Sequence, residues 1–313
     1  IRAFAWPAVL VTSVAQSASL GLQDVWGPVR CLAVASTVNL GGDLLLCPLL
    51  GYGIAGAAWA TMASQYVGAL LMLRSLHTLG RIRLAISPPP LPALLNFLSL
   101  TGPIFVSLAS KVSFYMLLTF QATSLGTLPL AAHQVIFGVF CLCAGCGEPL
   151  SQTAQSFLPR LCVGVNRNMQ KARRLLLALT LVAALLGAVE AAAALLISLC
   201  MPSLFTADPA VVAQIVRISP ALAVSLVLNP IVLSSEGALL ASRDVAYMAS
   251  TMTVAMLIGA LLLRAAQHWG LSLAGNWWIL VLFNSMRLTA AAMRLTSRQG
   301  IFSKGGLPQP MHA

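Results

Sequence analysis

Long uninterrupted apolar segments, each about as long as a bilayer is thick, restrict the fold of this chain more than any other feature. A window of about 20 residues finds them near 4–20, 28–48, 53–74, 93–122, 129–158, 175–201, 209–237, 245–263 and 275–295. Continuous runs of this kind differ from the ten-residue alternation of transmembrane β-barrel strands. We therefore predict an all-α, polytopic membrane bundle of about nine transmembrane helices.

The composition also indicates an integral, multi-pass membrane protein. Of the 313 residues, 59% are hydrophobic and 8% are charged, whereas about a quarter of the residues of soluble domains are charged. Lys and Arg outnumber Asp and Glu by 18 to 7. In a soluble protein that surplus would indicate nucleic acid. In a membrane protein the basic residues instead mark the connections that face the cytoplasm. We therefore predict membrane lipid as a partner and no nucleic acid.

The basic residues gather in the connections that follow the odd-numbered spans. These connections carry Arg30, Arg74, Arg81, Arg83, Arg160, Arg167, Lys171, Arg173, Arg174, Arg243, Arg294, Arg298 and Lys304. They should therefore face the cytoplasm or its topological equivalent. The first span then starts outside. Because the chain also begins at Ile1 without a targeting segment, we expect an N-terminally truncated fragment of a transporter with more spans.

A proline cluster at 81–92 is the strongest linker signal, because consecutive prolines cannot continue a helix. It separates a partial lobe of three spans at 1–80 from a six-span lobe at 93–300 and a tail at 301–313. A faint repeat relates the two lobes: eight residues lead from Gln16 to Asp24, and eight lead from Glu236 to Asp244. Internal repeats are usual in secondary transporters, whose ligand sites lie between the halves.

Four acidic residues within or at the ends of spans are the candidate proton or cation coupling groups: Asp43, Glu148, Glu190 and Glu236. Charge in hydrocarbon is costly, so such groups normally face a bundle interior or a wet cavity and take part in transport. Residue counting at about 1.5 Å per residue places Glu148 and Glu190 near mid-membrane, Asp43 further outward and Glu236 near the cytoplasmic end. The alternative is a structural carboxyl bonded to a neighbouring helix.

Polar residues near these acids are the candidate substrate contacts: Asn39, Lys111, Tyr115, Gln134, Gln152 and Gln155. Lys111 could attract an anion or neutralise a carboxylate, although about 12 Å of depth separates it from Glu148. Asn39 and Asp43 share a helix face and could hold a cation or join two helices. His133, beside Gln134, is expected to bond a neighbouring carbonyl.

The remaining motifs give no enzyme chemistry. Cys141, Cys143 and Cys146 are closely spaced, but a helix turns positions 141 and 143 about 200° apart, so we predict neither a metal site nor a disulfide framework. No nucleophile and base pattern, phosphate-binding glycine loop or zinc spacing occurs. We therefore expect a non-enzyme without cofactors that uses a proton or sodium gradient.

Several segments resemble a known family. The segments at 7–10, 51–65, 131–134 and 236–244 resemble multidrug and toxic compound extrusion (MATE) transporters. Those at 110–115, 147–157 and 166–173 are similar, more narrowly, to its plant and algal plastid-envelope subgroup. The resemblance implies that the nine spans are helices four to twelve of a twelve-helix, two-lobe monomer that opens alternately to either side.

The resemblance also implies a function and residue roles. The family exchanges organic substrates against inward protons or sodium, and its acidic coupling position on helix ten falls on Glu236. Many plant members carry a glutamate on helix seven, where this chain offers Lys111. We therefore expect a proton-coupled antiporter that exports organic anions such as aromatic carboxylates. The alternatives are a lipid-linked precursor flippase of the same superfamily, a membrane-embedded enzyme and a non-functional truncated product.

Overall fold

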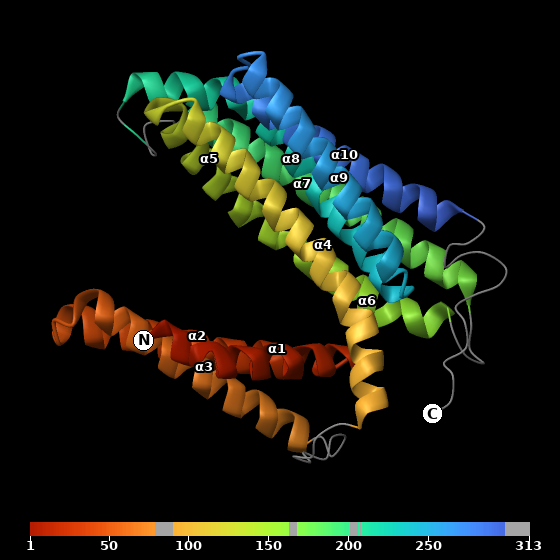
Figure 1. Cartoon of the computed structure of the whole chain (residues 1–313). Helices are drawn as coiled ribbons and strands as arrows, with labels where there is room; N and C mark the ends of the chain where they lie inside the picture. The colour runs from red at the N-terminus through yellow and green to blue at the C-terminus, as the bar shows by residue number, and fades with distance from the viewer. Residues whose placement is uncertain (79–89, 163–167, 201–205, 207, 298–313) are drawn as a thin grey trace. The chain divides into compact units, whose positions relative to one another are not determined.

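The computed structural model describes residues 1–78, 90–162, 168–200, 206 and 208–297. The chain divides into two compact units, Ile1–Pro89 and Pro90–Ala313, in which the regular elements of the described residues are helices (Figure 1). Most of the predicted linker, 81–89, and the predicted tail at 301–313 lie outside the described residues. The fold class predicted from the apolar runs is confirmed.

The first unit is a three-helix bundle. It consists of α1 (Trp6–Gly21), α2 (Trp26–Leu44) and α3 (Gly53–Thr78), and α3 packs against both other helices. Pro48 widens the end of α2 into a π-turn, Leu45–Leu49, in which the Leu50 amide donates to the Leu45 carbonyl at 3.0 Å.

The described residues of the second unit form seven helices built around α8. They are α4 (Leu91–Ser124), α5 (Thr127–Cys146), α6 (Glu148–Cys162), α7 (Met169–Cys200), α8 (Pro209–Ala241), α9 (Val245–His268) and α10 (Leu273–Thr296). The central helix α8 packs against α5, α6, α7 and α10. Because it is surrounded, α8 buries residues on more than one face.

Two apolar clusters occupy the two ends of the second unit. The larger one joins the N-terminal halves of α8 and α10 to α5 and the C-terminal parts of α4 and α7. The smaller one joins the C-terminal halves of α6, α8 and α10 to the beginning of α7. Buried polar residues lie between these clusters in sequence, and two of them are Asn284 and Arg287 of α10. We refer to Asn284, Arg287 and the polar residues that interact with them as the polar layer.

Seven helical segments are long and apolar enough to cross a membrane among the described residues, fewer than the nine predicted spans. The difference arises at α3 and α10, which form helices of 26 and 24 residues at the predicted places but are less apolar. In α10, Asn276, Asn284 and Arg287 lower the mean hydropathy, yet all three are buried. Polar residues that face the bundle therefore account for the shortfall in this helix.

The predicted fifth span, 129–158, is two helices. α5 ends at Cys146 and α6 begins at Glu148, while Gly147 packs against Pro230 and Leu233 of α8. A proline cannot donate to the preceding turn, so Pro149 is compatible with the first turn of a new helix. Gly147 alone separates the two helices and keeps helical backbone angles, φ −80° and ψ −21°, and Thr127–Cys162 is long and apolar enough to cross a membrane as one segment, so the break leaves the predicted span in place.

The internal repeat has a structural counterpart in two helix-to-helix turns. Gln23 and Arg243, whose numbers differ by 220, both have positive φ, 64° and 57°. In each turn the next amide closes back on the preceding helix, from Asp24 to the Ser19 carbonyl at 2.9 Å and from Asp244 to Leu239 at 3.1 Å. The same offset relates the start of α3, at residue 53, to that of α10, at residue 273.

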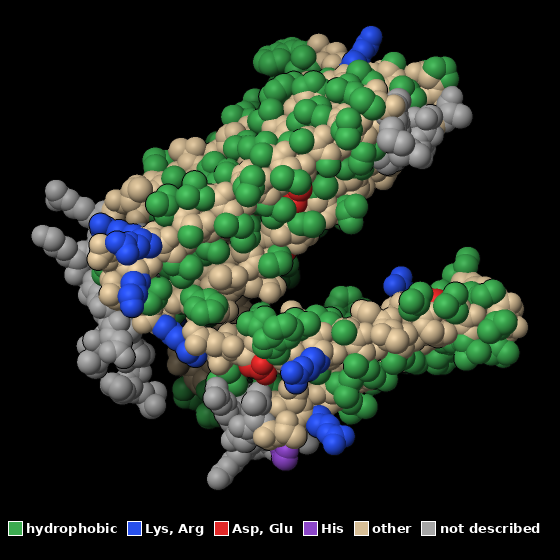
Figure 2. All heavy atoms as spheres, turned by 180° about the vertical axis from the view of Figure 1, so that it is seen from behind, with side chains coloured by type: hydrophobic (Ala, Val, Ile, Leu, Met, Phe, Trp, Pro, Cys, Tyr) green, Lys and Arg blue, Asp and Glu red, His purple; other side chains and the backbone are tan. Residues whose placement is uncertain are grey.

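The surface has the pattern expected of a membrane bundle. Large apolar side chains are exposed along the helices, and Figure 2 shows hydrophobic side chains spread over the visible face of each unit, with Lys and Arg in only a few places. At the end of the second unit that carries the smaller apolar cluster lie Arg160, Lys171, Arg173, Arg174, Arg243 and Arg294. This agrees with the sidedness predicted from the connections.

Candidate functional site

The polar layer is centred on an ion pair between Glu236 of α8 and Arg287 of α10. The guanidinium donates two hydrogen bonds to the carboxylate, from Nε to Oε1 and from Nη2 to Oε2, both 2.9 Å long. Its Nη1 donates to Asn284 Oδ1 at 2.9 Å. The side chain of Arg287 is 2% exposed and that of Glu236 is 13% exposed. Bidentate arginine–carboxylate pairs are among the stronger and more directional polar contacts in proteins.

Close packing holds the pair in place. Gly237, next to Glu236, lets α6 approach α8, because a Cβ there would lie 2.7 Å from backbone atoms of Ser151. The guanidinium of Arg287 lies 5.3 Å from the ring centroid of Phe283, and Phe283 stacks on Phe114 of α4 at 4.1 Å. The pair is thus supported from α4, α6, α8 and α10.

Helix α4 adds two of the predicted substrate contacts to this layer. Lys111 is half-buried and has no hydrogen bond or ion pair within the described part of the chain, yet its charge interacts with those of Arg287, Glu236 and Glu148. The hydroxyl of Tyr115 interacts with the guanidinium of Arg287. The predicted residues Lys111, Tyr115 and Glu236 are therefore brought together.

Arg287 is the residue that sequence reasoning missed. The ninth span marks it as an intramembrane base, but without knowledge of facing helices it has no partner and no role. An arginine one helical turn after Asn284, near the middle of the predicted span, is the signal that could have found it.

Helix α6 carries the predicted residues Glu148, Gln152 and Gln155. Glu148 begins α6 and is exposed, and its carboxylate has no hydrogen bond to a neighbouring helix among the described residues. A helix N-terminus favours a negative charge. Gln152 and Gln155 are both exposed, and Gln155 Nε2 donates to Ser151 Oγ at 3.1 Å.

Glu190 on α7 differs from the other acids because it is buried among apolar residues. It is 7% exposed, and no nitrogen or oxygen of the described residues lies within hydrogen-bonding reach of its carboxylate. The nearby polar groups that interact with it are the thiols of Cys146 and Cys143. Gly187, one turn earlier, packs directly on the Leu226 carbonyl, whose helical donor Pro230 removes.

In the first unit, Asn39 and Asp43 lie on one face of α2, as predicted. With the amide oriented to satisfy both neighbours, Asn39 donates to Asp43 Oδ2 and accepts from the Thr61 amide, each at 3.3 Å. A cavity of about 320 Å³ within this unit is lined by Asn39, Thr61, Ser64 and Gln65 among others. The arrangement could bind a small polar ligand or join α2 to α3.

The prediction for His133 is wrong. Its Nε2 lies 3.0 Å from Thr119 Oγ1 of α4, not from a carbonyl, and its ring is fully buried against Phe137 and near Trp277. The helix α5 starts six residues earlier, at Thr127, so His133 lies within the packed face of the helix. Gln134, the next residue, points away and is exposed. Among the described residues, no three His, Cys, Asp or Glu side chains group to hold a metal.

These features define a polytopic helical membrane protein with a charged layer inside one bundle. The family model described as MatE matches residues 103–263, which is more than half of the chain. The chain therefore belongs to the MATE family.

Several proteins of Arabidopsis thaliana are similar to this chain. It is 42% identical over 310 residues to "Protein DETOXIFICATION 47, chloroplastic", covering 99% of this chain and 57% of that protein. It is 29% identical to "Protein DETOXIFICATION 44, chloroplastic", covering 96% and 57%. The chain thus spans somewhat over half the length of these relatives.

Solved structures share the fold. A crystal structure of MATE in the straight conformation has a TM-score of 0.77 at 20% identity and covers 90% of this chain and 64% of that one. An outward-facing multidrug resistance MATE transporter has a TM-score of 0.70 at 20% identity, with coverages of 86% and 63%.

Proposed function

We propose that this chain forms part of a secondary active transporter that exports small organic anions and uses protons as the coupling ion. Membership of the MATE family supports the transporter class. The substrate class rests on Lys111, whose half-buried ammonium has no counter-ion of its own among the described residues. The other cation of the polar layer, Arg287, is already paired with Glu236. An anionic substrate would supply the missing charge.

The proposed mechanism is alternating access, with Glu236 and Glu148 as the groups whose proton occupancy changes. Protonating Glu236 leaves Arg287 uncompensated, so the contact between α8 and α10 depends on the proton. That dependence would let protonation favour one arrangement of the helices. Because two similar Arabidopsis proteins are named as chloroplastic, we place the transporter in the plastid envelope.

A lipid-linked precursor flippase is less favoured. Such a substrate carries phosphate groups and calls for several free cations in the cavity. In the polar layer Arg287 is committed to Glu236, and Arg217, near the start of α8, is exposed. We also infer that the chain has no enzymatic activity.

Transport by the full-length protein in liposomes tests the proposal. With an imposed pH gradient, a panel of labelled aromatic carboxylates should move, while amines of the same size should not. Lys111→Gln should reduce carboxylate transport at least several-fold, and Arg217→Gln, which removes an exposed cation of α8, should leave it unchanged. Equal movement of amines and carboxylates, or full activity of Lys111→Gln, would overturn the anion assignment.

A further inference from the structure

The carboxylate of Glu236 occupies the guanidinium of Arg287 in the way that a bound organic carboxylate would. Both of its oxygens are held, by Nε and Nη2 of Arg287 at 2.9 Å. The two donors lie side by side in the planar arrangement that matches a carboxylate. In this form the protein's own side chain fills an anion site.

The surroundings of the pair supply further donors that Glu236 does not use. Asn284 Nδ2 is buried and has no hydrogen-bond partner among the described residues, although its Oδ1 accepts from Arg287 Nη1. The ammonium of Lys111, whose charge interacts with those of Arg287 and Glu236, likewise forms no hydrogen bond within that part of the chain. A buried donor without a partner is costly, so a ligand that reached it would gain a contact that the resting structure leaves unmade.

The charged and titratable groups around Glu236 belong to three neighbouring helices. Arg287 comes from α10, and Lys111 and Tyr115 come from α4. The carboxylate of Glu148, on α6, interacts electrostatically with the ammonium of Lys111. With Glu236 ionised, its charge cancels that of Arg287. With Glu236 protonated, the layer has two cations and the single exposed carboxylate of Glu148.

From this geometry, and resting on the organic-anion class proposed above, we propose that Arg287 with Asn284 is the carboxylate-binding site and that it opens when Glu236 takes up a proton. One proton binds to the Glu236 carboxylate, the two hydrogen bonds to Arg287 are released, and the substrate carboxylate takes them over. The net uptake is one proton and one anion, and no covalent bond other than that of the proton forms or breaks.

This proposal gives the coupling a definite sign. Because the proton and the anion favour each other at this site, each must raise the affinity for the other by the same factor. Exchange requires that the two exclude each other. Any exchange of substrate against inward protons would therefore depend on another carboxyl, for which Glu148 and the buried Glu190 are the candidates in this unit.

Calorimetric binding of benzoate to the purified full-length protein in nanodiscs tests the proposal. Titrations between pH 6 and 8, in buffers of different ionisation enthalpy, give both the affinity and the number of protons taken up. The wild-type protein should bind more tightly as the pH falls, by up to about tenfold per pH unit if one proton accompanies each anion, and benzamide should not bind. Glu236→Gln should bind benzoate at all pH values without proton uptake, and Arg287→Gln should lose binding at least tenfold.

The second arginine pair provides a matched control. Asp244→Asn removes the carboxylate held by Arg294 and should leave the pH dependence and proton uptake unchanged. Proton-independent binding by the wild type, or loss of benzoate binding in a Glu236→Gln protein that still elutes as a folded monodisperse species, would overturn the proposal. If either of these two outcomes occurs while the protein still transports carboxylates in liposomes, this inference alone is rejected. If no carboxylate is transported at all, the proposed function is rejected.

Discussion

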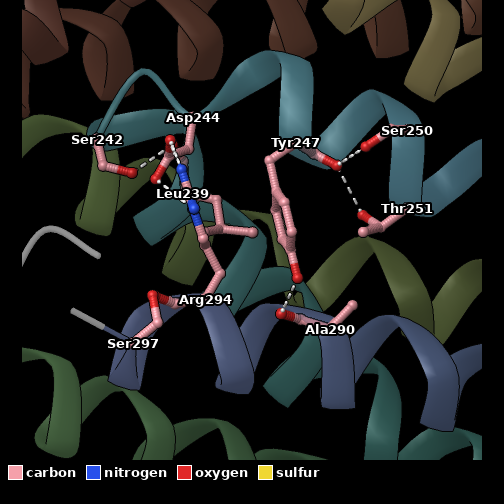
Figure 3. Close-up of polar contacts among 9 residues, drawn as sticks. All are labelled: Leu239, Ser242, Asp244, Tyr247, Ser250, Thr251, Ala290, Arg294 and Ser297. Atoms are coloured by element: carbon pink, nitrogen blue, oxygen red, sulfur yellow. Dashed lines mark hydrogen bonds and ion pairs between the residues drawn. The ribbon is translucent and has the colours of Figure 1, made fainter. Parts of the chain in front are cut away.

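Glu236–Arg287 and Asp244–Arg294 are both bidentate arginine–carboxylate pairs, but their surroundings differ. Glu236–Arg287 has side-chain exposures of 13% and 2%, whereas Asp244–Arg294 has 22% and 20%. Figure 3 shows the second pair at the turn between α8 and α9, near Tyr247, whose hydroxyl donates to the Ala290 carbonyl at 2.9 Å. Burial decides how much each pair contributes, because water screens the exposed one.

We expect Arg287→Met to be far more destabilising than Arg294→Met. Removing one member of a buried pair strands a charge and costs about 3–5 kcal/mol, whereas losing a half-exposed pair costs about 0.2–1 kcal/mol. Unfolding in detergent mixtures, monitored by circular dichroism, measures both. Similar losses for the two variants would show that burial of Arg287 in the bundle does not govern its contribution.

Glu190→Gln should not lower the stability, and we expect it to raise the midpoint of thermal unfolding by a few degrees. Within the described part of the chain the buried carboxyl has no nitrogen or oxygen partner, and an amide of the same shape avoids the cost of a buried charge. If Glu190 is a coupling group, the same substitution will also flatten the pH dependence of transport. A large destabilisation would instead reveal a structural bond to the thiol of Cys146.

At the residue scale, the sequence predicts roles for Lys111 and Glu236 but not for Arg287, the partner of Glu236. Lys111 and Glu236 were singled out because charge in an apolar run is conspicuous, and both reach the polar layer. Pairing with Arg287 depends on which faces of α8 and α10 meet across about 50 residues of chain, which no local pattern encodes. Glu148, singled out by the same rule, lies exposed at a helix start.

At the element scale, close helix approach depends on a few glycines. A Cβ at Gly187 of α7 would lie 2.8 Å from the carbonyl oxygens of Leu226 and Val227, so α7 and α8 touch through their backbones there. Small residues at such crossings are typical of membrane helices. The apolar runs predicted where the helices are because hydropathy dominates their sequences, but this contact and the break at Gly147 depend on the neighbouring helix α8.

Gly187→Ala should destabilise the protein by about 1–3 kcal/mol, the usual cost of overpacking. Gly138→Ala is the matched control, because Gly138 is also helical but an added Cβ there would meet no neighbouring element within 4 Å. Alanine there should be neutral or stabilise α5 by up to about 1 kcal/mol through its helix propensity. Comparable losses at both positions would contradict the backbone contact of α7 with α8.

At the scale of the whole molecule, the basic residues and the two apolar clusters predict which helix ends share a side. Asn168 and Ser297 lie at the end of the smaller cluster, whereas Thr127 and Trp269 lie at the end of the larger one. The positive connections place the first pair on the cytoplasmic side or its equivalent.

Single cysteines at these four positions, in a background without native cysteines, should react with an impermeant maleimide in two groups. Asn168→Cys and Ser297→Cys should label from one side of sealed vesicles, and Thr127→Cys and Trp269→Cys from the other. Permeabilised vesicles, in which all four positions should react, provide the control. Labelling of all four from one side would refute the topology.

The two copies of the repeated turn differ in how their aspartate is bound. In the second unit Asp244, which follows the left-handed Arg243, is bound by Arg294 of α10 at 2.9 Å. In the first unit the Gly27 amide donates a hydrogen bond of 3.0 Å to Oδ1 of the equivalent residue, Asp24. Arg74, the counterpart of Arg294, forms no ion pair within the described residues. Neutralising Asp24 should therefore not detach the first turn from its third helix, whereas neutralising Asp244 removes an ionic contact between the second turn and α10.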